Sequence, residues 1–323
     1  MATSDTVPGS WVVLLKPYVS EDGLASFTEA VQTAIQDPSK PHIKQNFNLP
    51  ECRGFSGEFD LDTKEGTEKM DTVLSVEPNT VAYIIDTGMN KDHVDFESRA
   101  SRWPKLVTSN PSASDEDVMG HGTHVAGTVG GKDHGVAKKA NIISIKIFSD
   151  ITRRARNDDI IKALEWVSSD AKLHGKTGVV NMSLGGPGPN SSLNAAVAAT
   201  VRSGVPAPAD NFCPASEPLA ITVGSMDKTD EISDFSNYGR FVDAFGPGTD
   251  ITSAWIGSTT AKETISGTSM ATPHVTGLAC CLLSDATLQE KTPYGVISEL
   301  NLRADKNKLL GLDRVTSNII VQV

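Results

Sequence analysis

The stretch TVAYIIDTG, Thr80 to Gly88, sets a run of apolar and β-branched residues directly before an aspartate and a glycine-containing turn. A short apolar run that ends in turn residues predicts a buried β-strand. Downstream of it, further strand-like runs alternate with helical patterns as far as a helix expected to start near Ser269. Over residues 79–323 this alternation predicts an α/β fold, a mostly parallel sheet with helices on both faces. The functional site of such a sheet lies at the carboxyl ends of its strands.

The pattern of residues 1–78 is different. Strand-like runs cover residues 10–17 and 72–78, a helical pattern covers 21–35, and the stretch ECRGFSGEFD at 51–60 is rich in turn residues. These elements predict a small α+β domain that precedes the larger one.

Composition restricts the classes of partner. The chain has 323 residues, 38% of them hydrophobic, and a formal net charge of −11. The negative charge argues against nucleic acid and against an anionic membrane surface as partners. No apolar run approaches the roughly 20 residues of a membrane span. The start, MATSDTVPGSWVVLLKP, lacks the basic residues and the apolar run of a secretion signal, so an intracellular location is expected, or a secreted or vacuolar one if a signal is missing from this sequence.

The chain has few cysteines for its length. Cys280 and Cys281 lie inside an apolar helical pattern and are expected to pack as small hydrophobic side chains. Cys52 and Cys213 could pair or remain free. None of the spacings is typical of a zinc site.

A serine stands at the start of the last apolar helical pattern, in the stretch TISGTSMATPHVTG. The first N–H groups of a helix carry a partial positive charge, so a helix that begins near Thr268 would give Ser269 an exposed hydroxyl and an N–H able to hold an oxyanion. Pro273 would then lie close to the first turn, where its missing N–H has little effect. The alternative is a serine that only caps the helix. A nucleophile also needs a base.

Two segments offer such a base and a carboxylate to orient it. Asp86 ends the first apolar strand, although it could instead cap a helix. The segment MGHGTHVAGTVGG places His121 and His124 three residues apart at the start of a small-residue helix. Two histidines at this spacing could bind a metal, but the glutamate of an H-E-x-x-H site is absent. His121, between two glycines, is the better candidate for an accessible base, and His124 for a structural role.

Asp86, His121 and Ser269 follow one another in the chain order typical of subtilisins. The segments around them, together with VVNMSLGG, PASEPLAITVGS and DFSNYGRFVDAFGPG, resemble the motifs of the subtilase family, in particular those of its fungal proteinase K group. The resemblance covers most of residues 80–285. Residues 10–78 resemble the inhibitory propeptide of the same family.

The resemblance implies a serine endopeptidase. Its partners would be a peptide or protein substrate and its own propeptide-like region. Ser269 would be the nucleophile, His121 the base and Asp86 the residue that orients the imidazole, while the Ser269 N–H would bind the oxyanion. The segment with Ser183, Leu184 and Gly185 would bind the substrate backbone as an added strand.

The resemblance also implies a structural calcium ion, although no cofactor would be needed for catalysis. Members of the family bind calcium through groups that match Pro218, Ala220 and Asp243. Carbonyl ligands leave no signature in a sequence, so this expectation rests on the resemblance alone.

The chain departs from the family between Ser203 and Pro218. Subtilases carry here a strand that ends in Ala-Gly-Asn, whose asparagine donates to the oxyanion. This motif is absent, Pro206 and Pro208 are expected to break the strand, and Asn211 lies too far along to match. We expect a weakened protease. A catalytically silent homologue that binds peptides or inhibits proteases is the alternative, and an error in joining coding segments would also produce such gaps.

Two further departures concern the domain junction and a loop. The long segment that separates propeptide and aspartate strand in the family is missing between Pro78 and Asp86, so self-cleavage at the junction is expected to be blocked or to damage the fold. The loop at 149–159 carries Arg153, Arg154 and Arg156, which could favour acidic side chains in a substrate, although a solvated loop is the simpler interpretation.

Overall fold

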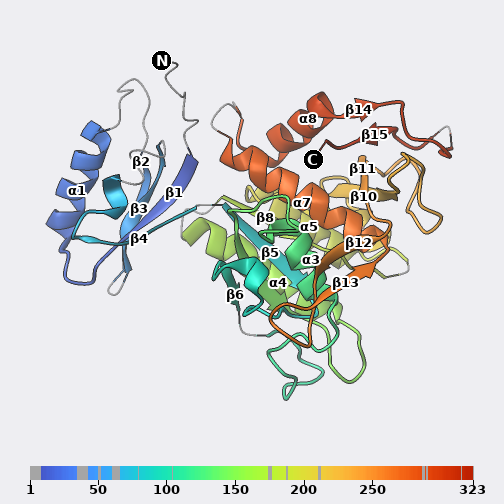
Figure 1. Ribbon diagram of the computed structural model, residues 1–323, viewed down its shortest axis with the longest axis horizontal. Helices are drawn as coiled ribbons and strands as arrows, with labels where there is room; N and C mark the ends of the chain where they lie inside the picture. The colour runs from blue at the N-terminus through green and yellow to red at the C-terminus, as the bar shows by residue number, and fades with distance from the viewer. Residues whose placement is uncertain are drawn as a thin grey trace.

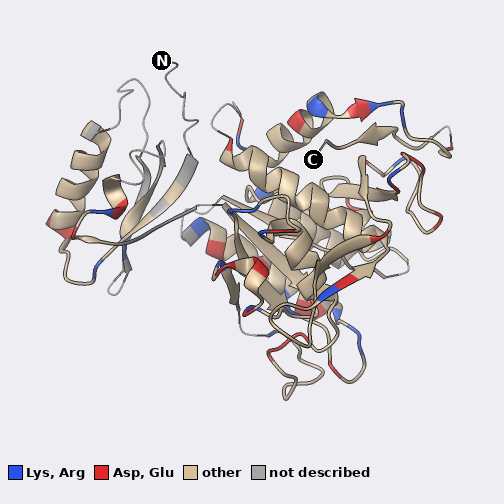
Figure 2. Ribbon diagram, viewed as in Figure 1, with Lys and Arg blue, Asp and Glu red and all other residues tan. Residues whose placement is uncertain are grey.

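The computed structural model of the chain comprises a small domain and a large domain joined by a single connection (Figure 1). The structure describes residues 9–34, 43–49, 52–59, 66–78, 80–103, 105–173, 177–186, 188–209, 212–285, 288, 290–313 and 315–322. Among these residues, no helix combines the length and the apolar character that a bilayer crossing requires. Figure 2 shows acidic and basic residues interspersed along the loops and helix ends.

The small domain is a four-stranded antiparallel sheet in the order β2-β3-β1-β4 with one helix. Its elements are β1 (Gly9–Leu15), α1 (Glu21–Ala34), β2 (Ile43–Leu49), β3 (Cys52–Phe59) and β4 (Val73–Pro78). Trp11, Val13, Val31 and Phe55 are buried together in its core. The α+β composition agrees with the pattern of the sequence.

The stretch 51–60 was expected to be rich in turns, and this expectation was wrong. Most of it forms β3, which lies between β1 and β2. Gly57 pairs with Trp11, and Gly54 pairs with Leu14. Glycine is common in turns, but inside a strand it often marks a place where another group approaches closely. The composition of this stretch alone could not distinguish the two cases.

The large domain is built on two groups of strands that join into one sheet. The first has the order β6-β7-β5-β8, and the second has the order β14-β15-β11-β10-β9. The strands are β5 (Thr80–Asp86), β6 (Ala100–Arg102), β7 (Asn141–Lys146), β8 (Thr177–Asn181), β9 (Pro208–Ala209), β10 (Ile221–Met226), β11 (Ala244–Pro247), β14 (Asp305–Lys306) and β15 (Ile319–Ile320). All neighbours pair in parallel except β14 with β15. A hairpin of β12 (Ile251–Ala254) and β13 (Lys262–Ile265) stands apart from this sheet.

Helices cover both faces of the sheet, as the sequence predicted. They are α3 (His121–Gly130), α4 (Asn157–Leu173), α5 (Ser191–Arg202), α7 (Thr268–Ser284) and α8 (Pro293–Arg303), with the short η1 (Val94–Phe96) and α6 (Phe212–Ala215) in loops. Alternate residues of β5 serve the two cores. Tyr83 and Ile85 pack with α4 and α5, whereas Ala82 and Ile84 pack with α3, α7 and α8. This two-sided burial explains the continuous apolar run that ends in Asp86.

The two prolines leave a strand of only two residues in the segment 205–209, namely β9, but the segment stays hydrogen-bonded to its neighbours. The carbonyls of Pro206 and Pro208 accept hydrogen bonds from the N–H groups of Val180 and Met182 in β8, at 2.9 and 3.0 Å. On the other side, Ile221 of β10 donates to the Ala207 carbonyl at 3.1 Å. A proline lacks only the donor, so its carbonyl can still accept a hydrogen bond, and these bonds connect the segment to the strands on both sides.

The connection between the domains lies at the amino edge of the large sheet. Pro78 ends β4, and Thr80 begins β5. The Thr80 hydroxyl lies 2.5 Å from the hydroxyl of Ser284, the last residue of α7. Asp86 lies at the other end of β5, on the carboxyl edge, where the sequence predicts the site.

Candidate active site

Asp86 and His121 meet at the carboxyl edge of the sheet. Asp86 is the last residue of β5 and is fully buried, and its Oδ1 lies 2.8 Å from Nδ1 of His121. His121 is the first residue of α3, and a third of its side chain is exposed. An imidazole held by one nitrogen on a buried carboxylate keeps the other nitrogen available for proton transfer.

A glycine permits this close approach of helix and strand. A Cβ on Gly122 would lie 2.2 Å from the Gly88 carbonyl oxygen and 3.1 Å from the Asp86 Cβ. The glycine that follows His121 therefore lets the first turn of α3 pack directly against the end of β5.

Asp117 organises the turn that carries His121, a role that the sequence analysis missed. Its Oδ1 accepts the Gly120 N–H at 2.9 Å and the Thr87 hydroxyl at 2.9 Å, and its Oδ2 accepts the Thr123 N–H at 2.9 Å. A buried aspartate that accepts N–H groups at a helix start is stabilising there. The available signal was an aspartate a few residues before a predicted helix, which a search for nucleophiles and bases passes over.

His124 is turned away from this site. It is fully buried, its Nε2 lies 2.9 Å from the Ile251 carbonyl, and its ring packs edge-on against Trp255. Burial lowers its pKa to about 4. These contacts agree with the structural role expected of it, and within the described residues no cluster of three or more His, Cys, Asp or Glu side chains could hold a metal.

Ser269 lies at the same edge as Asp86 and His121. It is the second residue of α7 and is half-buried. Its carbonyl accepts a hydrogen bond of 2.9 Å from the hydroxyl of Ser183, which follows β8. Asn181 at the end of β8 pairs with Ile84, two residues before Asp86. Helices α3 and α7, which begin with His121 and Thr268, also pack against one another.

The predicted substrate-binding segment leaves β8 beside Ser269. Ser183 and Leu184 are buried, whereas Gly185 is exposed. Gly186 forms an antiparallel bridge with Cys213, and nothing lies within 4 Å of a Cβ built on it. Cys213 is a free thiol, one of the two states that the sequence left open for it.

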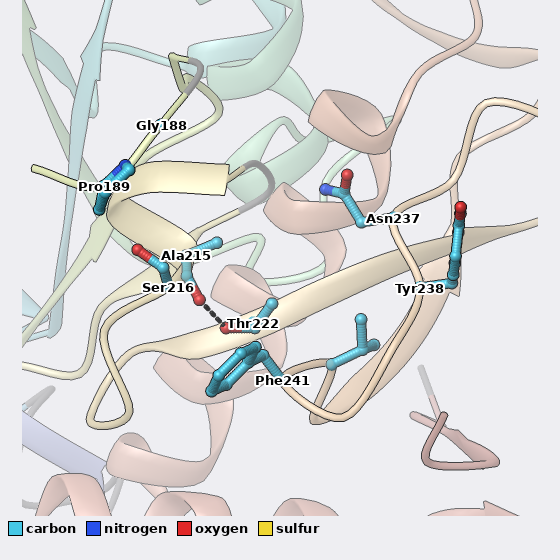
Figure 3. A pocket seen from close by; sticks show the side chains of 9 residues that line it. Gly188, Pro189, Ala215, Ser216, Thr222, Asn237, Tyr238 and Phe241 are labelled. Atoms are coloured by element: carbon cyan, nitrogen blue, oxygen red, sulfur yellow. Dashed lines mark hydrogen bonds between the residues drawn. The ribbon is translucent and has the colours of Figure 1, made fainter. Parts of the chain in front are cut away.

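An apolar pocket of about 350 Å³ adjoins the end of this segment (Figure 3). Gly188 and Pro189 line one side, and the aromatic side chains of Tyr238 and Phe241 lie on the loop opposite. The hydroxyl of Thr222 in the wall is already bonded to the Ala215 carbonyl at 2.6 Å. The pocket therefore offers mainly apolar contact area.

Other predicted site residues lie elsewhere or outside the described chain. Asn211, considered as an oxyanion donor, lies outside the described residues. Arg156 pairs with Asp158 at 2.9 Å, so much of its charge is compensated, while Arg153 and Arg154 are exposed on the loop.

The predicted calcium ligands surround the start of β10 and β11. Asp243 accepts the Thr222 N–H at 2.8 Å, and burial raises its pKa to about 6. Pro218 and Ala220 lie on the turn that leads into β10. A partly desolvated carboxylate next to a carbonyl-rich turn has the donor chemistry that calcium prefers.

The sequence model of peptidase S8, the subtilase family, matches residues 78–314. The chain belongs to the subtilase family. This finding confirms the resemblance on which the residue roles were predicted. The structure of a cold-adapted subtilisin-like serine proteinase is similar to this subtilase, with a TM-score of 0.67 and 39% identity over 75% of this chain and 87% of that one. It confirms the predicted α/β fold.

Two fungal relatives illustrate the extent of the similarity. Alkaline protease 1 of Aspergillus clavatus is 46% identical over 215 residues, which cover 63% of this subtilase and 52% of that protein. Alkaline protease 1 of Aspergillus flavus is 34% identical over 376 residues, which cover 97% of this chain and 89% of that protein. The second alignment is longer than the 323 residues of this chain, so the relative contains segments that are missing here.

Proposed function

We propose that this subtilase is a serine endopeptidase that hydrolyses peptide bonds with Asp86, His121 and Ser269. The observation that carries the proposal is the 2.8 Å contact between Asp86 Oδ1 and His121 Nδ1 at the sheet edge where α7 starts with Ser269. The names of the relatives, which include alkaline and subtilisin-like proteases, support it.

The proposed reaction assigns one task to each group. Asp86 accepts the Nδ1–H of His121 and so leaves Nε2 unprotonated, as a base needs to be. His121 takes the proton of the Ser269 hydroxyl while the oxygen attacks the scissile carbonyl, and it then returns the proton to the leaving amine. The N–H of Ser269, at a helix start, faces the oxyanion that develops.

The second oxyanion donor of the family has no counterpart in the segment Val205–Ala209. Removal of one such donor lowers turnover by roughly 10² to 10³, a magnitude measured on a subtilisin and therefore taken over from the same family. The hydrogen bonds that β8 donates to the carbonyls of Pro206 and Pro208 mean that this loss need not disturb the neighbouring strands. We therefore propose a slow protease.

A fluorophosphonate probe tests the proposal. The wild-type chain is expected to be labelled and to hydrolyse a fluorogenic protein substrate slowly, and Ser269→Ala is expected to lose both signals. The matched control is Ser266→Ala, which changes an exposed serine in the turn before α7. Absence of labelling in the wild type would favour the alternative, a silent homologue that binds peptides.

We also propose that calcium binds at Asp243 with the carbonyls of Pro218 and Ala220. The two influences on the pKa of Asp243 are burial, which raises it, and the Thr222 N–H, which lowers it. A bound cation would compensate the buried charge. Calcium is expected to raise the thermal unfolding midpoint, and Asp243→Asn is expected to abolish most of that increase. An equal increase in both proteins would refute this site.

A further inference from the structure

Pro273 removes one of the hydrogen bonds expected within α7, the one to the carbonyl of Ser269. In an α-helix the N–H of residue i+4 donates to the carbonyl of residue i, and for Ser269 that residue is Pro273, which has no N–H. The sequence analysis placed Pro273 close to the first turn. Because α7 begins at Thr268, Pro273 lies in the second turn, where an N–H would normally donate to the carbonyl four residues earlier.

A side chain from another element supplies a donor to this carbonyl. The hydroxyl of Ser183 donates to the Ser269 carbonyl oxygen at 2.9 Å. Ser183 is 4% exposed, and Ser269 is half-buried. The hydroxyl of Ser183 therefore gives the Ser269 carbonyl a donor in place of the N–H that Pro273 lacks.

Two further residues fix the direction of the Ser183 hydroxyl. The side-chain amide of Asn181 donates to the Ser183 oxygen at 2.9 Å, and the hydroxyl of Thr276 donates to the Asn181 oxygen at 2.8 Å. Asn181 and Thr276 are both fully buried. Because the Ser183 oxygen already accepts a bond from Asn181, its own proton is directed to the Ser269 carbonyl.

The hydrogen-bonded path begins and ends on the same helix. Thr276 lies seven residues after Ser269, which is two turns along one face of α7. The path runs from Thr276 through Asn181 and Ser183 to Ser269, and so ties the first turn of α7 to the end of β8.

We infer that Ser183, Asn181 and Thr276 are positioning residues for the reaction. They replace the donor that Pro273 lacks and hold the turn that presents the Ser269 hydroxyl and N–H. The inference rests on the proposed function of Ser269. It also gives the side chain of Ser183 a role different from the substrate contact predicted from the sequence, a contact that its backbone can still make.

A double-mutant cycle between Ser183→Ala and Pro273→Ala tests this inference. Pro273→Ala restores an N–H that can donate to the Ser269 carbonyl, so the Ser183 hydroxyl becomes less important. The readouts are the rate constant of fluorophosphonate labelling and the midpoint of urea unfolding. Ser183→Ala is expected to slow labelling about tenfold, the equivalent of one hydrogen bond, but less than about threefold in the Pro273→Ala background.

Peptide kinetics separate positioning from substrate binding. A positioning role predicts that Ser183→Ala lowers kcat at unchanged KM. Thr276→Val, which removes the hydroxyl at nearly constant shape, is expected to lower kcat by a smaller factor, and the matched Thr276→Ser to restore it. An increase of KM at an unchanged labelling rate would mean that Ser183 acts on the substrate and would overturn the inference.

The unfolding midpoints keep the test independent of the proposed function. If the wild type is not labelled, the proposed function fails, and the midpoints decide the inference alone: Ser183→Ala should lower the midpoint less in the Pro273→Ala background. Equal losses in both backgrounds would overturn the exchange of donors. If the effects of Ser183→Ala and Pro273→Ala on the unfolding midpoint depend on one another, but Ser183→Ala is labelled as fast as the wild type, the bond is only structural. That result would overturn the positioning role.

Discussion

The imidazole of His121 and the carboxylate of Asp86 join the start of α3 to the end of β5 through a contact of 2.8 Å. Asp86 is fully buried, and His121 is partly exposed. One side of the pair is therefore fixed in the protein while the other can reach a substrate.

Asp86→Asn should lower the rate of peptide hydrolysis by about 10⁴, because an amide no longer selects the imidazole tautomer that leaves Nε2 as a base. The measurement is kcat/KM on a peptide substrate. Asp92→Asn changes an exposed aspartate a few residues further along and should leave the rate within twofold. An Asp86→Asn protein that keeps a tenth of the activity would contradict the assigned role.

Asp117→Asn should lower both the rate of hydrolysis and the unfolding midpoint. The amide cannot accept all the N–H and O–H donors that now converge on the Asp117 carboxylate, so the turn before His121 loosens. Asp115→Asn removes an exposed carboxylate that pairs with Lys105, and exposed pairs contribute little. If both variants behave alike, Asp117 does not organise the site.

The stability of the large domain should fall as the pH decreases from about 6.5 to about 4. Burial lowers the pKa of His124 to about 4 in the folded state, against 6.5 for an unperturbed histidine, so the unfolded chain binds the proton first. The stability that neutral His124 contributes is complete above pH 6.5. It is lost on acidification to about pH 4, by up to about 3 kcal/mol. His124→Gln keeps a donor for the Ile251 carbonyl and should flatten urea midpoints measured over this interval. An unchanged slope would show that His124 does not drive the loss.

The purified chain should not cut itself between Glu77 and Thr80. Thr80 contacts Ser284, the last residue of α7, whereas Ser269 is the second residue of that helix. At 1.5 Å per residue, the helix separates the domain junction from the nucleophile by about 22 Å. To reach Ser269, β5 would have to leave its place between β7 and β8. N-terminal sequencing after prolonged incubation checks this, and a clean new terminus in that interval on an active product would refute it.

The sequence predicted those placements that depend on local pattern. An apolar run before Asp86, glycines around His121 and a helix after Ser269 are signals carried by neighbouring residues, and the contact between Asp86 and His121 followed from their place at strand and helix ends. The α/β class followed from the alternation of strands and helices.

What the sequence did not predict depends on partners far along the chain. Pro206 and Pro208 remain within the sheet because strands on both sides need only their acceptors. The stretch that forms β3 pairs its glycines with Trp11 and Leu14. The hydroxyl of Ser183 donates to the carbonyl of Ser269, 86 residues further along the chain. Such matches between distant groups have no local pattern.

The central claim is that Ser269 is a nucleophile activated by His121. It is tested most directly by mass-spectrometric mapping of the fluorophosphonate adduct in the wild type and in His121→Ala. The account predicts a single adduct on the peptide that contains Ser269, formed at least about 10³ times more slowly in His121→Ala. An adduct on another residue, or equal rates in the two proteins, would contradict it.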